Sequence, residues 1–276
     1  MKLQYLGTAA AEGWPALFCK CEACEKARRL GGKDIRTRSQ SIVDDRLLLD
    51  LPADTYLHVL KFGVDLPSIE HILITHSHED HFYPLDMILK APPYAQRSES
   101  VKAIRVYGNS VVIDMLRKTM AASGIGDVGD YIIPTEIHPF ETFRAGDYEV
   151  TAYLGQHIPG ENCYIYGIEH GGSRLLYAHD TGLFPEETWE HLKGVRFDAV
   201  SLDCTCQLDA TTGGHMGLPN DITVRDRLVQ IGCADKNTKF VINHFSHNGK
   251  VCHEDLVRAA GEKGFITSYD GMSIKF

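Results

Sequence analysis

The sequence predicts an α/β fold in which sheets are covered by helices. Three observations support this class: short strand-like runs recur along the whole chain, helical patterns fall between them, and 43% of the 276 residues are hydrophobic. Strands that alternate with helices are typical of sheets packed against helices. A chain of this length can bury a full core, so we expect residues 1–276 to form one domain.

The expected strands are short apolar segments with β-type spacing. In chain order they are Lys2–Leu6, Ser41–Asp50, His71–Ile74, Ala103–Tyr107, Tyr148–Leu154, Cys163–Ile168, Arg174–Ala178, Asp198–Leu202, Lys239–Ile242 and Met272–Lys275. Helical periodicity falls between them. The expected helices are Ala53–Lys61, Tyr83–Lys90, Ser110–Ala122, Pro185–Leu192, Asn220–Ile231 and His253–Glu262.

Amino-acid composition and net charge indicate the cellular compartment of the protein and the classes of partner that it can bind. No apolar run reaches the ~18 residues of a membrane span, and the chain passes straight from Met1 into a strand-like segment. Eight cysteines are too few for a disulfide scaffold of this size. We therefore expect a soluble, cytoplasmic protein with no membrane partner. A formal net charge of −9 is a poor match for a long nucleic acid.

A histidine-rich motif directly follows the strand predicted at His71–Ile74. The run from Thr75 to His81 reads THSHEDH and packs three imidazoles and two acidic side chains into seven residues. Imidazole and carboxylate ligands suit zinc, manganese and iron. The first two histidines point the same way in an extended turn, and Asp80 and His81 are expected to open the next helix. One loop could thus serve two ions; the alternative is a polar surface turn.

Three later residues of the same ligand types each follow a strand-like run. His157, Asp180 and His244 come 76, 23 and 64 residues after the preceding ligand, starting from His81. This order and spacing resemble the metallo-β-lactamase superfamily, which implies a four-layer αββα sandwich of α/β (α+β) class. Asp50 matches the acidic residue that opens the motif series of that family. By the resemblance, one ion is held by His76, His78 and His157, the other by Asp80, His81 and His244, and Asp180 bridges the two.

A cysteine cluster near the N-terminus predicts a second kind of metal site. Cys19, Cys21 and Cys24 have the C-x-C-x2-C spacing of a loop that wraps one soft-ligand ion. Three thiolates need a fourth ligand for a tetrahedral zinc site, and His247 is our candidate because it shares the loop of His244. Residues 19–24 would then be a structural zinc loop; the alternative is three free thiols on the surface.

Motifs along the whole chain resemble the PhnP-type cyclic phosphodiesterases of phosphonate breakdown. They include the cysteine cluster, Tyr5–Thr8, Gly13–Ala16, Asn243–His247 and Tyr269–Met272. The resemblance implies a homodimeric enzyme with two active-site ions (Mn or Zn, possibly Fe) that hydrolyses a small cyclic phosphate by a metal-bridging hydroxide. The best substrate guess is 5-phosphoribosyl 1,2-cyclic phosphate. The stretch 91–135 does not match, and we expect it to shape the substrate pocket.

The same resemblance implies the catalytic residues. Asp80 and Asp180 belong to the two-ion centre, and His215 stands where the family carries a histidine that gives a proton to the leaving alkoxide. Asp203 is expected to orient a metal histidine. His179 should face away from the ions because it precedes Asp180 on a strand. Cys204 and Cys206 are expected to pack, with thiolate ligation as the alternative.

Three other enzyme classes of this fold differ from this chain in residues or segments that they need for their function. Flavo-diiron reductases carry glutamate where this chain has His78, common zinc β-lactamases use a cysteine at the second ion, and transfer RNA processing nucleases depend on a basic arm that this sequence lacks. A thioester or lactone hydrolase stays chemically possible because the same hydroxide attacks carbonyl carbon. So does a non-catalytic metal-binding accessory protein, as the related pyrroloquinoline quinone accessory proteins suggest.

Overall fold

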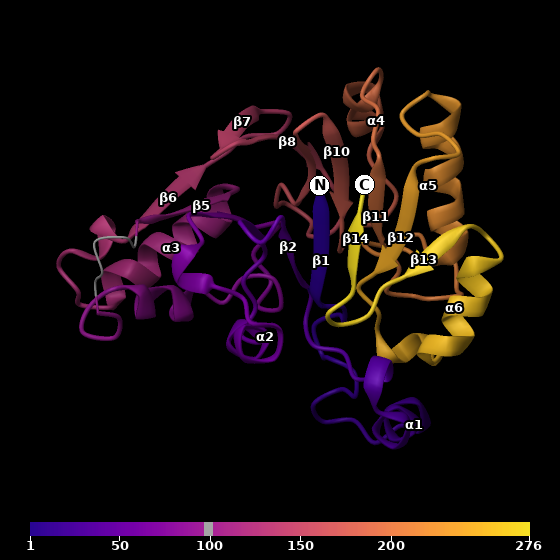
Figure 1. The fold of residues 1–276 in the computed structure, drawn as a ribbon, viewed down its shortest axis with the longest axis horizontal. Coiled ribbons are helices and arrows are strands. Elements are labelled where there is room, and N and C mark those ends of the chain that lie inside the picture. The colour runs from indigo at the N-terminus through magenta and orange to yellow at the C-terminus, as the bar shows by residue number, and fades with distance from the viewer. Residues whose placement is uncertain (97–101) are drawn as a thin grey trace.

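Two seven-stranded sheets lie face to face, and helices cover both outer faces (Figure 1). The computed structural model describes residues 1–96 and 102–276. In the first sheet the strand order is β14-β1-β2-β3-β4-β5-β6, and in the second it is β13-β12-β11-β10-β9-β8-β7. The chain therefore builds most of the first sheet, then the second, and returns with β14 to pair with β1.

The strands have the following bounds. The first sheet contains β1 (Lys2–Gly7), β2 (Gln40–Val43), β3 (Leu47–Leu49), β4 (His71–Leu73), β5 (Ile104–Gly108), β6 (Ile132–Glu136) and β14 (Ser273–Lys275). The second contains β7 (Thr142–Ala145), β8 (Tyr148–Leu154), β9 (Tyr164–His170), β10 (Ser173–Ala178), β11 (Ala199–Asp203), β12 (Lys239–Asn243) and β13 (Phe265–Thr267).

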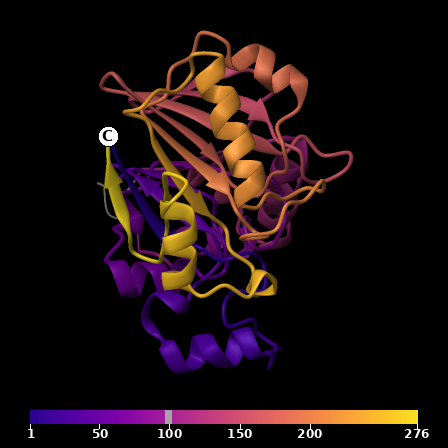
Figure 2. The same cartoon turned by 90° about the vertical axis from the view of Figure 1, so that its right-hand side faces the viewer.

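Three apolar layers hold these elements together. Between the sheets, alternate residues of facing strands such as Leu3, Leu73, Val150 and Tyr177 form a buried core. The first sheet packs outward on α2 (Thr55–Phe62), the 3-10 helix η3 (Pro84–Lys90) and α3 (Ser110–Ala122). The second packs on α1 (Glu22–Leu30), α4 (Glu186–Leu192), α5 (Leu218–Gln230) and α6 (His253–Gly261). Figure 2 shows α5 lying across the second sheet.

The expected elements are present, but two of them have a different form and several further elements were not expected. The strand predicted over Ser41–Asp50 is a hairpin, because Asp44 and Asp45 adopt positive φ and turn the chain between β2 and β3. The helix predicted over Tyr83–Lys90 is a 3-10 helix that begins at Pro84. Strands β6, β7 and β13 and helix α1 were not predicted. Helix α1 starts within the cysteine cluster. Because the spacing of the cysteines indicated a metal-binding loop, the apolar face of the helix, formed by Ala23, Cys24 and Ala27, was not recognised.

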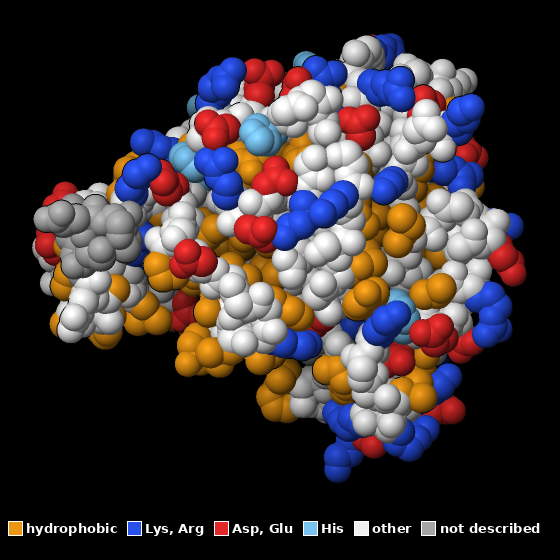
Figure 3. All heavy atoms as spheres, viewed as in Figure 1, with side chains coloured by type: hydrophobic (Ala, Val, Ile, Leu, Met, Phe, Trp, Pro, Cys, Tyr) orange, Lys and Arg blue, Asp and Glu red, His pale blue; other side chains and the backbone are white. Residues whose placement is uncertain are grey.

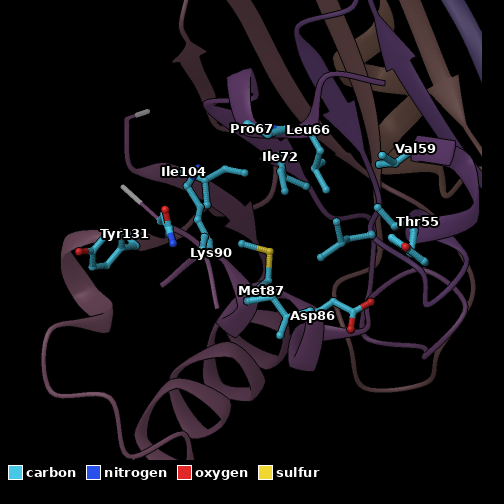
Figure 4. Close-up of a pocket in the computed structure, with 15 residues that line it drawn as sticks. Thr55, Val59, Leu66, Pro67, Ile72, Asp86, Met87, Lys90, Ile104 and Tyr131 are labelled. Atoms are coloured by element: carbon cyan, nitrogen blue, oxygen red, sulfur yellow. The ribbon is translucent and has the colours of Figure 1, made fainter. Parts of the chain in front are cut away.

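An apolar cavity of about 370 Å³ lies outside the first sheet, against α2 and η3 (Figure 4). Ile72 of β4, Ile104 of β5, Val59 of α2 and Met87 of η3 line it. Its lining contains no histidine or cysteine among the described residues. The cavity is therefore separate from the ligand-type residues. None of the described helices is both long and apolar enough to cross a lipid bilayer.

Candidate metal centre

The ligand-type residues gather where strands of both sheets end. His76 follows β4, His157 follows β8, Asp180 follows β10 and His244 follows β12. Strands β10, β11 and β12 are parallel, so their carboxyl ends meet at one edge of the second sheet. The two sheets face each other, which brings the loop after β4 to that same edge. Long-range packing thus collects side chains that are far apart in sequence.

The first ligand group consists of His76, His78, His157 and Asp180. The Nδ1 atom of His78 lies 3.0 Å from Nε2 of His157, and Oδ2 of Asp180 lies 3.3 Å from Nε2 of His76 and 3.2 Å from Nε2 of His157. Four ligand atoms around a tetrahedral ion with bonds of ~2.05 Å stand about 3.4 Å apart. These separations fit one divalent ion.

The second ligand group consists of Asp80, His81, His244 and again Asp180. Nε2 of His81 lies 3.1 Å from Nε2 of His244 and 3.3 Å from Oδ2 of both Asp80 and Asp180. All four side chains are buried. Since Oδ2 of Asp180 belongs to both groups, its carboxylate occupies the position of a bridging ligand. The structure therefore brings together every residue of the predicted two-ion set.

Two properties of the ligand side chains are consistent with a cation bound between them. Nε2 of His76 and Oδ2 of Asp80 are buried and have no hydrogen-bond partner in the described structure, which is costly unless something else satisfies them. Burial and the neighbouring His81 lower the pKa of His76 to about 4. That imidazole is neutral at pH 7, the state in which histidine binds a metal.

The remaining pKa values reflect the crowding of acids and imidazoles. Burial opposes a charge on His244, but Asp180 and Asp203 outweigh it and raise the pKa to about 9. Burial likewise opposes the ionised form of Asp180, yet His244 and the other surrounding imidazoles hold its pKa well below the usual range. Protons on the imidazoles thus balance the buried carboxylates in the protein alone, and a bound cation would displace them.

A surrounding layer of polar groups orients the ligand side chains. Asp50 Oδ2 lies 2.7 Å from Nδ1 of His81, and its Oδ1 accepts the backbone N–H of Thr75 at 2.8 Å. Thr205 Oγ1 lies 2.8 Å from Nδ1 of His244 and donates to Asp203 Oδ2. Such outer contacts select the ring nitrogen that faces the ion. Asp203 Oδ2 also lies 3.3 Å from Nδ1 of His244, a position from which it could orient this imidazole; that role stays a prediction.

The loop that carries His76 and His78 depends on a residue that the sequence did not indicate. Glu161 accepts hydrogen bonds from Ser77 N at 2.9 Å and Ser77 Oγ at 2.6 Å, and also from Asn109 Nδ2. Ser77 and Glu161 lie 84 residues apart, and no local pattern links them. The serine between the two histidines was the only available signal.

The turn after His78 differs from its expected form. Asp80 and His81 do not open a helix; the backbone N–H groups of His81 and Phe82 both donate to the His78 carbonyl, which forms a tight turn. The 3-10 helix η3 begins only at Pro84. This turn lets two adjacent residues, Asp80 and His81, both face the second ligand group.

His215 stands at the rim of the same site. Its Nδ1 lies 2.8 Å from Oδ1 of Asp180 and 3.7 Å from Oδ2 of Asp203, and the side chain is 37% exposed. Burial disfavours its charged form, but contact with these two carboxylates prevails and raises the pKa to about 11. At neutral pH this imidazole carries a proton beside the ligand groups. The proton-donor role expected for His215 stays a prediction.

A cleft of about 580 Å³ opens over the ligand groups. His78, Asp80, His157, Asp180 and His215 line its base. Residues from three further segments, 10–12, 205–211 and 246–249, also line it.

The expectation that the stretch 91–135 shapes this pocket is wrong for the part of it that the structure describes. None of residues 91–96 and 102–135 lines the cleft over the ligand groups. Ala95, Gln96, Ile104 and Tyr131 instead line the apolar cavity. Residues 97–101 lie outside the described residues. The described part of the stretch contributes β5 to the first sheet and α3 to the helices that pack on the outer face of that sheet.

The cysteine cluster forms a separate ligand group. Cys19, Cys21, Cys24 and His247 place one ligand atom each within 4.8 Å of one another. Nδ1 of His247 lies 3.4 Å from the Cys21 sulfur and 3.8 Å from the Cys19 sulfur. The backbone N–H of Cys24 and the His247 ring lower the pKa of Cys21 to about 6, which favours the thiolate that zinc binds. The residues present fit a zinc ion.

Several other residues lie where the sequence placed them. His179 faces away from the ligand groups: its Nε2 lies 2.7 Å from Ser201 Oγ, and its Nδ1 accepts from Asn243 Nδ2 at 3.1 Å. Cys204 is fully buried in the core of the second sheet. Cys206 differs, because it lines the cleft; it belongs to none of the ligand groups among the described residues.

Comparison with known proteins finds one relative that matches nearly the whole chain and another that matches a shorter segment. Coenzyme PQQ synthesis protein B of Azoarcus sp. (strain BH72) is 23% identical over 311 residues that cover 99% of both chains. An octanoyltransferase of Porphyromonas gingivalis is 32% identical over 90 residues, which are 31% of this chain and 17% of that protein. The chain thus spans only a small part of that second relative.

Solved structures have the same fold. Zinc-bound PqqB from Methylobacterium extorquens superposes with a TM-score of 0.77 at 20% identity and full coverage of both chains. A diphosphatase from the PhnP family superposes with a TM-score of 0.72 at 21% identity, covering 100% of this chain and 97% of that one. The two sheets and their helices are therefore the four-layer metallo-β-lactamase fold. A family model described as a beta-lactamase superfamily domain matches residues 52–233, so the chain belongs to that superfamily.

Proposed function

We propose that this protein is a metal-dependent phosphodiesterase that hydrolyses a small cyclic phosphate. The observation that carries the proposal is the pair of ligand groups that share Asp180, with His215 on the same carboxylate. Two ions a few ångströms apart suit in-line displacement at phosphorus, because they can stabilise both the attacking and the leaving oxygen. The PhnP resemblance adds 5-phosphoribosyl 1,2-cyclic phosphate as the reference substrate, and manganese, zinc or iron as the ions.

The ligand residues and His215 would have different roles in the reaction. Divalent ions bound by the two ligand groups would lower the pKa of a water and polarise the phosphoryl group. Asp180 and Asp80 would supply negative charge that balances the charge of the bound ions. His215, protonated because of Asp180 and Asp203, would give its proton to the departing alkoxide. Its Nδ1 faces the two carboxylates, which leaves Nε2 as the donor toward the cleft.

The size and charge of the molecule favour a small substrate. A cleft of about 580 Å³ is of the size that binds small molecules. On the face in Figure 3, Lys and Arg side chains are interspersed with Asp and Glu. With a formal net charge of −9, such a surface offers little to the phosphate backbone of a long nucleic acid.

A second candidate is a metal-binding accessory protein without turnover. The similarity to Coenzyme PQQ synthesis protein B over 99% of both chains favours it. The two candidates differ in what they predict for His215. An accessory protein needs the ligand groups but has no use for a proton donor next to them.

The test is a panel assay on purified protein whose metal content has been measured. The substrates are ribosyl 1,2-cyclic phosphates, 2′,3′-cyclic nucleotides, a nitrophenyl phosphodiester, a diphosphate diester, a thioester and a lactone. We expect turnover of the cyclic phosphates that is lost in Asp80→Ala while the protein stays folded. Turnover of the thioester or lactone alone would replace the proposal by the carbonyl hydrolase. No turnover of any substrate by fully metal-loaded protein would favour the accessory protein.

A further inference from the structure

The imidazole of His157 is oriented by a backbone carbonyl from another loop. Its Nδ1 lies 2.9 Å from the oxygen of Gly214, and a carbonyl oxygen can only accept, so the ring carries its proton on Nδ1. In the uncharged ring Nε2 then has the free lone pair, and this atom lies 3.2 Å from Oδ2 of Asp180 in the first ligand group. The Gly214 carbonyl thus selects the ring nitrogen that can bind an ion.

The residue after Gly214 is His215, the expected proton donor. Nδ1 of His215 lies 2.8 Å from Oδ1 of Asp180. The next backbone N–H, that of Met216, donates to Asp203 Oδ1 at 2.7 Å and fixes the segment at that end. Because a metal-orienting carbonyl and the expected proton donor are neighbours in the chain, a displacement of this segment would move both.

The segment lies close to the ligand groups because a buried residue next to it has no side chain. A Cβ atom at Gly182 would overlap with the carbonyl oxygen of Gly213, which belongs to the backbone and cannot rotate away. Gly182 is itself held, since its N–H donates to the carbonyl of Gln156 at 2.8 Å. Gln156 directly precedes His157, so the loops of Gly182, His157 and Gly213 are packed backbone to backbone, an approach that requires glycine.

We propose that Gly182 and Gly214 are positioning residues that place segment 213–215 against His157, so that one contact serves both metal binding at the first ligand group and proton donation by His215. The part on proton donation rests on the proposed function. The part on metal binding depends only on the arrangement of the ligand side chains, and it can be tested without a substrate.

The first experiment measures zinc affinity by titrating the zinc-loaded protein with a chelator. In Gly214→Ala the added methyl would stand 3.0 Å from Nδ1 of His157, and we expect about tenfold weaker binding of one zinc ion. Gly182→Ala meets backbone and should weaken it by about 100-fold. Gly126→Ala is the control, because nothing lies within 4 Å of its added methyl. Wild-type affinity in a folded Gly214→Ala protein would overturn the inference, even if Gly182→Ala does not fold.

A double-mutant cycle tests whether Gly214 acts through His157. In a His157→Ala background, Gly214→Ala should change the affinity for the zinc that is still bound by less than about twofold. Equal losses in both backgrounds would mean that the added methyl acts by another route, and they would contradict the inference.

The last experiment compares a cyclic phosphate, whose alkoxide leaving group needs a proton, with a nitrophenyl phosphodiester, whose leaving group does not. In zinc-saturated Gly214→Ala the ratio of the two rates should fall by about tenfold, because His215 moves with the segment. A general loss of stability would lower both rates alike, so an unchanged ratio would overturn the shared role of the contact. If the wild type turns over neither substrate, the proposed function fails, and the zinc titration still decides the part on metal binding.

Discussion

At the scale of single residues, the centre is organised around one carboxylate. Oδ2 of Asp180 lies 3.2–3.7 Å from ring nitrogens of four histidines, and its Oδ1 lies 2.8 Å from a fifth, His215. The residue adopts a φ of 54°, a left-handed conformation that aspartate tolerates better than most residues. The backbone thus turns sharply after β10 so that this side chain can reach both ligand groups.

The first prediction concerns this shared ligand. Asp180→Asn keeps the shape but removes the charge that both ions would share, so we expect metal content to fall and activity to drop more than about 100-fold. Elemental analysis and steady-state kinetics measure the two effects. Asp127→Asn is the control, because this aspartate lies in no ligand group of the described structure. Two ions and full activity in Asp180→Asn would contradict the bridging role.

The second prediction separates proton donation from metal binding. His215→Ala should lower turnover of substrates with alkoxide leaving groups by about 10²–10⁴-fold but should spare a nitrophenolate, which departs without a proton. The readout is the ratio of the two rates in variant and wild type, with His138→Ala as the control. Similar losses on both substrates would assign His215 a structural role instead.

At the scale of elements, the cysteine loop and α1 depend on each other. Helix α1 begins next to Cys21, has no side-chain cap at its N-terminus, and buries only Ala23, Cys24 and Ala27. Nine residues with so small an apolar face are marginal as an isolated helix. A zinc ion held by the four ligand-type residues would anchor its first turn, in the manner of other structural zinc sites.

The third prediction follows from this anchoring. Cys21→Ser should lower the melting temperature by several degrees and release zinc, while the chemistry at the other ligand groups largely persists. Differential scanning calorimetry and zinc analysis measure the outcome, and Lys20→Ala alters the neighbouring side chain as a control. Unchanged stability and zinc content would show that Cys21 is a free thiol.

A buried histidine of helix α2 makes the folding stability of the protein depend on pH. His58 lies buried under the first sheet, 2.6 Å from Gln40 Oε1 and 2.7 Å from Thr37 Oγ1. Burial lowers its pKa to about 4. Between that value and the ordinary value near 6.5, the unfolded chain binds a proton that the folded chain does not, so stability falls as the pH falls through this window.

The fourth prediction isolates that contribution. His58→Gln should be less stable than wild type at pH 7. Between pH 6.5 and pH 4, however, its unfolding free energy should fall by up to about 3 kcal/mol less than that of wild type. Urea unfolding at several pH values gives the two slopes. His138→Gln removes a histidine outside this buried site and serves as the control. Parallel pH profiles for wild type and His58→Gln would refute the assignment.

At the scale of the whole molecule, hydrogen bonds from the second sheet position the loop that follows β4 of the first sheet and carries His76. Tyr166 of β9 donates its hydroxyl to the Ile74 carbonyl at 2.6 Å, and the backbone N–H of Tyr164 donates to the Thr75 carbonyl at 2.8 Å. Tyr5 of β1 lies 2.8 Å from Ser201 Oγ of β11. These bonds cross the interface between the sheets, so the fold fixes the loop of His76 from the opposite layer.

The fifth prediction tests this cross-sheet support. Tyr166→Phe leaves the Ile74 carbonyl buried without its partner, which should cost about 1–3 kcal/mol of unfolding free energy and weaken metal binding at the His76 loop. Chemical denaturation and metal titration measure both effects. Tyr56→Phe removes an exposed hydroxyl as the control. A variant with wild-type metal affinity would mean that the loop is positioned without this bond.

Much of the fold and of the ligand set could be predicted because local signals were strong. The helix at Ser110–Ala122 matches α3 residue for residue, since its periodicity is long and uninterrupted. The three-residue turn from Asp44 to Arg46 was missed because a short hairpin has the same apolar pattern as one longer strand. Strands β7 and β13 escaped because they lie at sheet edges, where one strand neighbour is missing and the apolar pattern weakens.

The sequence by itself determined which side chains can bind metal, because ligand chemistry depends on residue type and the motif sits where strands end. Only the tertiary structure decided which of them share an ion, and that Glu161, Asp203 and Glu12 surround them. The physical reason is that these contacts join segments far apart in the chain. Their distances arise from the packing of two sheets, and no local periodicity encodes that packing.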